Sequence, residues 1–428
     1  MQNICKDKTI LILGGSYHHI KLVEAAKELQ VKTVVTDYLE EKDSPTKRIA
    51  DKAFFCDIKD IDSVLDICKK EKIDGIIATH LDPAQIPYAT LCQKLNLPCI
   101  GTPEQFYCMT NKRAFKKMCI ENNVDVIPEY SLEDVINNKI EYPVYVKPVD
   151  SRGSRGQSIC YNKEELLKAI DFAKKNSSNE DVIIEKYIEN GQEFHITYFF
   201  VNGTPYLIRT SDCHKGKQHH NSDKFIAGSI APSKFTKDYL KTTNDKVIKM
   251  FQNLGIKNGP VFMQGFKDGN YFRFFDPGLR FPGIDFVKLY KKVFGVDLIQ
   301  MLIIFALTGQ MPDIKLKKNS FDLDGKKSSI LFPSIKKGRI NKITGEDKIK
   351  QLKSVLSYNS RYKVGDLVEW TYDINQRFAE IDILGNNISD IANTINLINS
   401  TLHIYNEENS EMLFQLFDTA KILNGDYE

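Results

Sequence analysis

The stretch VYVKPVDSRGSRGQ, residues 144–157, decides how the rest of the chain is interpreted. It begins as a short β run that delivers Lys147 and continues as a loop with two glycines, two serines and two arginines. Glycines let backbone N–H groups close around phosphate oxygens, and hydroxyl and guanidinium groups add donors. The strand lysine supplies a compact charge for the same phosphates. The Gly-x-x-x-x-Gly-Lys-Ser/Thr pattern is absent, so the stretch is either a phosphate loop of another kind or a basic surface hairpin.

A second signal follows at residues 181–193, DVIIEKYIENGQE, which has the pattern of a strand, a short apolar connection and a second strand. Glu185 ends the first strand, and Glu193 comes eight residues later. The backbone and Glu185 would then read an adenine edge, while Glu193 would accept hydrogen bonds from ribose hydroxyls. An ordinary strand–turn–strand unit with exposed acids explains the same letters.

A third signal consists of residues 262–266 and 272–283, two strand-like runs on either side of a hairpin turn. Gln264 and Asp276 fall on these adjacent strands and offer oxygen ligands of the kind that Mg²⁺ prefers. Arg280 lies in the loop beyond, where a guanidinium can bind a phosphate or a carboxylate through two hydrogen bonds. Alternatively, Asp276-Pro277-Gly278 is only a turn at the end of a strand.

Composition narrows the class of protein. The 428 residues carry a formal charge of +3, from 59 Lys+Arg against 56 Asp+Glu, which argues against dominant binding to nucleic acid or a membrane surface. The nine cysteines form no Cys-x-x-Cys pair, so we expect buried thiols in a reducing cytosol. The polar start shows no signal peptide, and the apolar run 293–307 is too short and too polar to span a bilayer.

The chain changes its secondary-structure pattern near residue 110, and its length suggests about three domains. Before that point strand and helix signals alternate, which predicts a parallel sheet covered by helices. The expected strands are 9–13, 32–36, 75–78 and 99–101, and the expected helices are 19–29, 61–70 and 84–95. Afterwards strands joined by Asn-Gly and Asp-Gly turns predict an α+β region with antiparallel sheet. The tail begins with strands and has helix signals at 389–402 and 412–424.

In this order and spacing, the three signals resemble the ATP-grasp superfamily of carboxylate–amine ligases over about residues 1–310, with a looser match in the tail. The resemblance implies a Rossmann-like pre-ATP-grasp domain at 1–110, a two-lobed ATP-grasp domain at 111–310 with a lid lobe at about 125–190, and a C-terminal α+β domain at 311–428. The fold class is thus α/β followed by α+β.

The resemblance also implies roles for individual residues. Lys112 and Lys147 match the family's two lysines, and Arg280 would act with Lys147 on the reacting phosphate. Gln264 and Asp276 would bind one or two Mg²⁺ ions, with Mn²⁺ as a substitute. The expected contacts to ATP come from the lysines, the loop over the triphosphate, the adenine hinge and the ribose acid, namely Lys112, Lys147, Ser151, Gly153, Ser154, Gly156, Gln157, Glu185, Lys186, Tyr187, Ile188 and Glu193.

The chain departs from the family in the last metal-binding strand. The usual Glu-x-Asn-Pro-Arg is replaced by Asp276-Pro277-Gly278-Leu279-Arg280, so glycine stands where the family has an asparagine ligand. Gln264 as the upstream ligand is similar to carbamoyl-phosphate-synthetase-like members. One Mg²⁺ is therefore the safer expectation.

The activity implied by the resemblance is attack of a carboxylate on the γ-phosphate of ATP, followed by capture of the acyl phosphate by an amine. Amino acids are the expected substrates, in a cytoplasmic enzyme that binds neither nucleic acid nor membrane and forms a homodimer. A purine-pathway or biotin-carboxylase-like enzyme is the alternative within the class, and a non-catalytic ATP-binding regulatory protein is the alternative outside it.

Two groups of histidines have open interpretations. His18, His19 and His80 lie near expected strand ends, where they either touch a substrate or cap local structure. The tract at 214–220 is expected to be a mobile loop near the triphosphate, because no acid or cysteine completes a metal site there. A Gly14-Gly15-Ser16 turn lacks the Gly-x-Gly-x-x-Gly pattern of a dinucleotide site.

Overall fold

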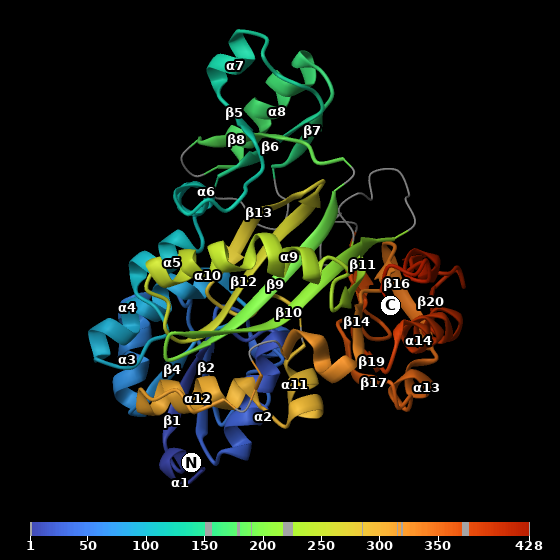
Figure 1. Cartoon of the computed structure of the whole chain (residues 1–428). Coiled ribbons are helices and arrows are strands. Elements are labelled where there is room, and N and C mark those ends of the chain that lie inside the picture. Colours follow the sequence, from blue (N-terminus) through green and yellow to red (C-terminus); the bar gives the residue numbers. More distant parts are fainter. Residues whose placement is uncertain are drawn as a thin grey trace.

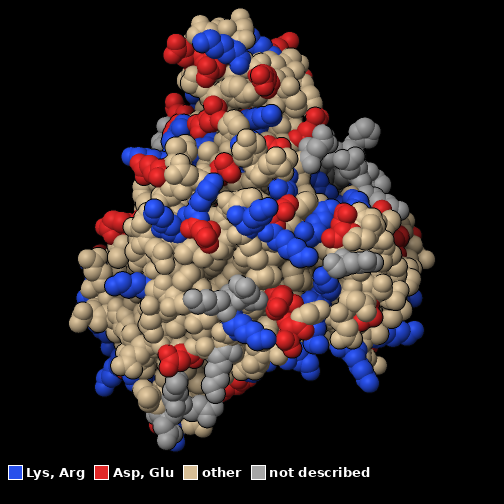
Figure 2. All heavy atoms as spheres, viewed as in Figure 1, with Lys and Arg blue, Asp and Glu red and all other residues tan. Residues whose placement is uncertain are grey.

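The computed structural model describes residues 2–149, 156–177, 180–189, 191–216, 226–284, 286–314, 316–317, 320–369 and 376–427. Figure 1 shows the N-terminal part at the bottom, a small lobe at the top, and the long strands of a central sheet between them. The C-terminal part lies at the side of this central sheet. Figure 2 shows Lys and Arg interspersed with Asp and Glu over the visible face, in line with the near-neutral total charge.

The N-terminal part is a parallel sheet with strand order β3-β2-β1-β4. Its strands are β1 (Thr9–Leu13), β2 (Lys32–Asp37), β3 (Lys52–Phe55) and β4 (Gly75–Ile77). The helices are α1 (Gln2–Cys5), α2 (Ile20–Glu28), α3 (Ile61–Glu71), α4 (Gln85–Leu95) and α5 (Pro103–Cys108). β1 and β2 are apolar runs buried along most of their length, as expected for a parallel sheet covered on both faces.

Two features of this part differ from the sequence prediction. The predicted strand at 99–101 is wrong, because these residues form no ladder and Ile100 N instead donates to the Tyr88 hydroxyl at 3.3 Å. The edge strand β3 was not predicted, since it has only four residues and its short apolar run, Ala53–Phe55, is mostly exposed.

The small lobe, here called the lid lobe, is an antiparallel sheet with strand order β5-β8-β6-β7. Helix α6 (Lys112–Glu121) leads into it. The lobe consists of β5 (Glu129–Tyr130), α7 (Leu132–Ile136), β6 (Val144–Pro148), β7 (Ser158–Cys160), α8 (Lys163–Lys175) and β8 (Val182–Lys186). Asn162 caps α8, whose apolar face covers the sheet and forms a separate small core.

The central sheet has eight strands in the order β13-β12-β9-β10-β11-β14-β19-β17. The first five come from residues 192–278, in β9 (Gln192–Val201), β10 (Thr204–Lys215), β11 (Ile226–Ala231), β12 (Gly259–Asp268) and β13 (Tyr271–Gly278). Helices α9 (Thr236–Thr242) and α10 (Asn244–Asn253) pack on one face of it. The Asn-Gly and Asp-Gly turns join β9 to β10 and β12 to β13, as predicted.

The C-terminal part contributes the other three strands of the same sheet, β14 (Lys327–Leu331), β17 (Val355–Ser360) and β19 (Ala379–Gly385). Its remaining elements are β15 (Ser334–Ile335), β16 (Gly338–Thr344), α13 (Glu346–Lys350), β18 (Leu367–Val368), α14 (Ile388–Thr401), β20 (His403–Asn406) and β21 (Leu413–Gln415). The helix predicted at 389–402 is confirmed as α14. The helix predicted at 412–424 is wrong, because this segment pairs as β21 and then forms a short 3-10 turn, Thr419–Lys421.

The apolar run at 293–307 crosses a break between two helices, α11 (Val287–Phe294) and α12 (Leu298–Thr308). Gly295 ends α11 in the left-handed conformation with φ of +69°. α12 is buried against α2 and β4, so it belongs to the cover of the N-terminal sheet. Among the described helices, none is both long enough and apolar enough to cross a membrane.

The contact between α12 and the N-terminal sheet depends on Gly75. A Cβ at this position would lie 2.4 Å from the Ala306 carbonyl oxygen, which belongs to the α12 backbone. We expect Gly75→Ala to lower the free energy of unfolding by about 1–3 kcal/mol through overpacking, measured by urea denaturation. Gly283→Ala is the matched control, because a Cβ there meets no atom within 4 Å, and it should change stability little. Equal stability of the two variants would contradict this packing.

Candidate active site

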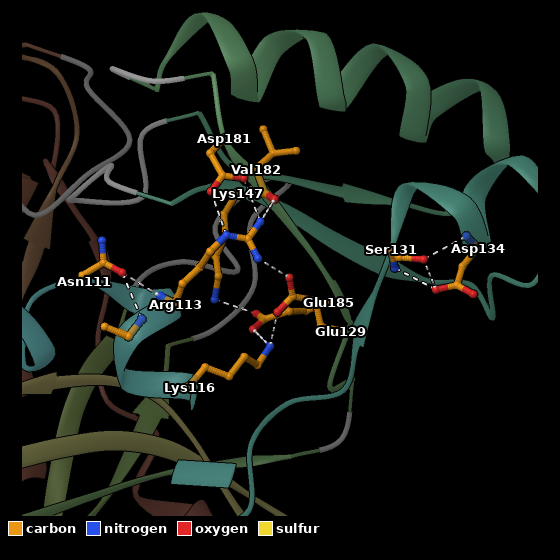
Figure 3. A network of polar contacts seen from close by, with 11 residues as sticks. Asn111, Arg113, Lys116, Glu129, Ser131, Asp134, Lys147, Asp181, Val182 and Glu185 are labelled. Carbon is orange, nitrogen blue, oxygen red and sulfur yellow. Dashed lines mark hydrogen bonds and ion pairs between the residues drawn. The ribbon is translucent and has the colours of Figure 1, made fainter. Parts of the chain in front are cut away.

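The Glu185 carboxylate lies between two lysines at the base of the lid lobe. Its two oxygens are 2.6 Å from Lys147 Nζ and 2.8 Å from Lys116 Nζ (Figure 3). Lys147 comes from β6 and Glu185 from the neighbouring β8, while Lys116 comes from α6. Burial acts to raise the pKa of Glu185, but the two ammonium groups outweigh it and hold the pKa below its usual value. The carboxyl group is therefore ionised at neutral pH.

Helix α6 is fixed to the lid lobe by a second ion pair. Arg113 donates to both Asp181 oxygens, with Nε to Oδ2 and a terminal nitrogen to Oδ1 both at 2.7 Å, and also contacts Glu129 at 3.0 Å (Figure 3). Asn111 caps the helix by accepting from the N–H groups of Arg113 and Ala114. The first residue of the helix, Lys112, is thereby placed with Nζ 3.4 Å from the Val149 carbonyl oxygen, at the end of β6.

Gln264 and Asp276 lie directly opposite each other on β12 and β13, as the hairpin predicts. Gln264 is also opposite His195 on β9, so a row of polar side chains crosses three strands on one face of the sheet. Burial and the Asp82 carboxylate raise the pKa of Asp276, and the charges of Lys112, Arg280 and Lys147 oppose this rise. The structure therefore brings these three predicted cations around one predicted metal ligand.

The oxygen donors Gln264 and Asp276 suit a hard cation such as Mg²⁺. Gly278 cannot give way to asparagine without rearrangement, because a Cβ there would lie 2.3 Å from Cε1 of Phe262. The phenyl ring of Phe262 fills the space beside the strand and stacks 4.8 Å from the Arg280 guanidinium. Position 278, where the family resemblance implies asparagine, is therefore a glycine whose missing side chain leaves room for the Phe262 ring.

Arg280 is buried and already paired. Its Nε and a terminal nitrogen donate to the two oxygens of Asp82 at 2.5 and 2.6 Å. Asp82 follows β4 in the N-terminal part, so this pair joins the N-terminal sheet to the end of β13. No sequence pattern indicated Asp82, because a single acid in a loop has no periodicity or motif around it.

The Glu193 carboxylate is hydrogen-bonded to His195, which lies two residues further along β9. Its Oε1 lies 2.7 Å from His195 Nε2, and Cys213 Sγ lies 3.5 Å from His195 Nδ1. Burial raises the pKa of Cys213, and the charge of His195 opposes this rise. Burial acts to lower the pKa of His195, but Cys213 and then Glu193 hold it above its ordinary value. The alternation of residues 193 and 195 along a strand could have indicated this pair.

The hinge and loop residues occupy the other side of the site. Lys186 N donates to Pro128 O at 2.9 Å and Tyr187 N to Pro143 O at 3.1 Å, so these two hinge N–H groups are used within the lobe. Ile188 is buried. The Tyr145 hydroxyl donates to Gln157. Gly156 has φ of +72° and packs against Pro148. The predicted Ser151, Gly153 and Ser154 lie outside the described residues.

The structure places the predicted histidines in three different environments. His19 is structural, with Nδ1 2.9 Å from Ser16 Oγ and Nε2 3.1 Å from Thr79 O. His18 and His80 stack with ring centroids 5.8 Å apart. His214 lies in β10, not in a loop, with Nε2 2.9 Å from the Tyr427 hydroxyl, and residues 217–220 lie outside the described ranges.

Comparison with known proteins agrees with this geometry. The model of the ATP-grasp domain matches residues 140–272, and the model of the PylC-like N-terminal domain matches residues 10–88. The chain is 25% identical over 210 residues to the carbamoyl phosphate synthase large chain of Clostridium botulinum (strain Langeland), covering 45% of this chain and 20% of that protein. It is 24% identical over 316 residues to the multifunctional protein ura1 of Schizosaccharomyces pombe, covering 69% and 14%. The chain thus spans a fifth or less of these two relatives.

Solved structures show the same fold over almost the whole chain. Phosphoribosylglycinamide synthetase from Anaerococcus prevotii has a TM-score of 0.74 at 20% identity, with 94% of this chain and 100% of that one covered. L-amino acid ligase from Bacillus licheniformis has a TM-score of 0.75 at 18% identity, covering 94% and 99%. Biotin carboxylase from Campylobacter jejuni has a TM-score of 0.75 at 19% identity, covering 96% and 94%. The predicted fold class is confirmed.

The Glu185 site makes a testable contribution to stability. Glu185→Gln leaves the buried Lys147 ammonium group without its carboxylate, whereas Lys116 keeps its ion pair with Glu129 at 3.0 Å. We therefore expect a loss of about 3–5 kcal/mol at pH 7, measured by urea denaturation. Because the folded pKa is lowered, the carboxylate stabilises the fold above pH 4.5, and the difference from wild type shrinks as the pH falls below that value. Glu164→Gln, in an exposed pair with Lys168, is the control and should cost less than about 1 kcal/mol. A pH-independent difference would contradict the assignment.

Proposed function

We propose that this chain, whose residues 140–272 are an ATP-grasp domain, is an ADP-forming carbon–nitrogen ligase that joins a carboxylate to an amine. The observation that carries the proposal is that Lys112, Arg280 and Lys147 lie near enough to Asp276 for their charges to act on its pKa, and that Lys112 Nζ reaches the end of the Lys147 strand. These groups come from α6, β6, β13 and the loop after β13, so their meeting is a property of the folded chain. Amino acids are the substrates we favour.

The residues meet the main requirements of phosphoryl transfer, which are positioning and neutralisation of charge. A carboxylate oxygen attacks the γ-phosphorus, and the bond to the bridging oxygen of ADP breaks. The amine then attacks the acyl carbon, inorganic phosphate leaves with the electrons of the C–O bond, and the ammonium nitrogen loses its proton. Lys147, Lys112 and Arg280 supply positive charge for the transferred group. Mg²⁺, held by Asp276 and Gln264, would neutralise further phosphate charge.

Two of these cations are held in place by carboxylates before any nucleotide binds. Lys147 is paired with Glu185 and Arg280 with Asp82, so each side chain is positioned by a partner that belongs to a different element. Cations fixed in this way need little reorganisation when the phosphates arrive, which is the condition for effective electrostatic catalysis.

Two other candidates are supported by particular observations. The similar TM-scores to phosphoribosylglycinamide synthetase and biotin carboxylase support a purine-pathway or biotin-carboxylase-like reaction equally well. Gly278 at the asparagine position supports an ATP-binding protein without turnover. We favour the ligase because the charges of Lys112, Arg280 and Lys147 still act on Asp276.

We further propose a cytoplasmic homodimer, and the free state of all nine cysteines supports a reducing compartment.

Release of ADP tests the ligase directly. The protein is assayed with MgATP and pairs of amino acids, with separate arms for ribosylamines and for bicarbonate with biotin. We expect one carboxylate–amine pair to stimulate ADP release, and Asp276→Asn to lower kcat by about 100-fold or more while adenine-nucleotide binding remains. Asp268→Asn, at the far end of the same hairpin, is the control that should stay active. An active Asp276→Asn enzyme would show that the metal ligand lies elsewhere.

Lys147 provides a second test, based on binding alone. Lys147→Met should weaken ATP affinity by about tenfold or more because a charged hydrogen-bond donor to the phosphates is lost. The measurement is calorimetric titration with a non-hydrolysable ATP analogue, with Lys168→Met as an exposed control on the same lobe. Unchanged affinity in Lys147→Met would count against the phosphate site.

A further inference from the structure

A second group of cations lies on the same face of the central sheet, away from Asp276. Arg209 on β10 is 3% exposed, and its guanidinium donates to the hydroxyls of Ser229 at 3.2 Å and Ser328 at 3.4 Å. Arg377, just before β19, stacks 4.0 Å from the Phe332 ring. Among the described residues, neither guanidinium is within ion-pair distance of a carboxylate.

Both arginines carry an electrostatic cost in this position. Burial lowers the pKa of Arg209 and of Arg377, and the nearby Arg361 lowers the pKa of Arg377 further. Glu380 acts on both arginines from a distance, but the Tyr17 hydroxyl donates to its Oε2 at 3.2 Å. A buried charge without a paired counter-ion costs several kcal/mol. Within the part of the chain that the structure describes, the Asp382 and Glu380 carboxylates act on Arg209 without forming an ion pair with it.

Other buried polar groups on this face also lack partners. Within the described residues, Nε of Arg209, the Ser211 hydroxyl and both ring nitrogens of His80 are buried without a hydrogen bond. Ser211 alternates with Arg209 along β10, so both side chains point to the same face as Glu193 and His195. His80 follows β4, outside the sheet itself, and its ring stacks with those of His18 and Phe281 at centroid distances of 5.8 and 5.7 Å. Buried polar groups are normally satisfied, which indicates that a ligand completes them.

The two sets of cations are distinct. The groups that act most on Asp276 are Asp82, Lys112, Arg280 and Lys147. Those that act most on Arg377 are Arg361, Glu380, Tyr17 and Cys213, and Arg209 shares Glu380 and Cys213 with it. The first set surrounds the predicted phosphoryl-transfer site, whereas the second lies where β10, β19 and the loop after β1 meet.

We propose that the carboxylate substrate carries a second anionic group, a carboxylate or a phosphate, that Arg209 and Arg377 bind while the reacting carboxylate lies near Arg280. Two guanidinium groups match the planar oxygens of either anion. His80 and Ser211 would contact the part of the substrate between its two anionic ends. This inference rests on the proposed ligase function and adds the class of acid that the enzyme accepts.

Matched pairs of acids test the inference by binding, without the need for turnover. Glutamate and glutamine, aspartate and asparagine, and phosphoserine and serine are titrated calorimetrically into the full chain, with and without MgADP. We expect at least one acid that carries a second anionic group on its side chain to bind about tenfold or more tightly than the counterpart that has only the α-carboxylate. The phosphoserine arm distinguishes a phosphate from a carboxylate as the second anion.

Variants connect this preference to the arginines. Arg209→Met and Arg377→Met should each weaken binding of the preferred acid about 10- to 100-fold, the effect of losing a charged hydrogen-bond partner, and leave MgADP affinity unchanged. Arg209→Met should also raise the midpoint of thermal unfolding of the ligand-free protein, since it removes an uncompensated buried charge. Arg339→Met, on an exposed arginine of the same C-terminal part, is the control and should change neither property.

Three results would overturn the inference. One is that no dianionic acid binds more tightly than its counterpart. The second is that Arg209→Met and Arg377→Met keep the preference. The third is that both variants unfold at lower temperature with selectivity unchanged, which would make the arginines structural. Failure of MgADP to bind, or of any acid–amine pair to release ADP, would instead count against the proposed ligase, because acid binding is measured independently.

Discussion

The architecture of the candidate site depends on one buried carboxylate, Glu185. It lies between Lys147 of the lid-lobe sheet and Lys116 of α6, the helix that leads from the N-terminal part into that lobe. A buried ion pair costs desolvation, and here the cost is offset because one carboxylate serves two ammonium groups. The same interaction that positions Lys147 also fixes the direction of α6, and with it Lys112. Placement of the two predicted phosphate-binding lysines therefore depends on the Glu185 pairs together with the Arg113–Asp181 pair, which holds the same helix.

The eight-stranded sheet provides the other constraint. Antiparallel register puts Asp276, Gln264 and His195 opposite one another on β13, β12 and β9, and the side-chain period of two keeps Glu193 on the same face. The C-terminal strands β14, β19 and β17 continue this sheet. The predicted third domain thus shares a sheet with the second. The register of β10 with β9 places Arg209 on the same face as His195 and Glu193, so polar side chains continue along this face beyond the Asp276 region.

The sequence was sufficient to predict groups that local pattern specifies. Lys147, Gln264 and Asp276 follow from strands and a hairpin turn, whereas Lys112 was assigned through the family resemblance and lies at the start of a capped helix. It could not predict partners such as Asp82, which binds Arg280, and Lys116, which binds Glu185, because these pairs form only through tertiary packing. The helix predicted near the C-terminus failed for a related reason. Its apolar residues serve a strand pairing and the core around Ile422, and a periodicity read without a partner strand does not distinguish these outcomes.

Glycine at position 278, instead of the asparagine that the family resemblance implies, goes together with a particular packing of Phe262 and Arg280. With glycine there, the Phe262 ring can lie against the strand, where a side chain at position 278 would collide with it. The same ring supports the Arg280 guanidinium at 4.8 Å, and Asp82 binds that guanidinium from the opposite part of the fold. Gly278 thus goes together with an aromatic surface that orients a cation. Under the proposed ligase function, the firmly held Arg280 would supply positive charge to the transferred phosphate that an asparagine-bound metal would supply in the usual arrangement. The glycine at position 278 is therefore compatible with the proposed phosphoryl transfer.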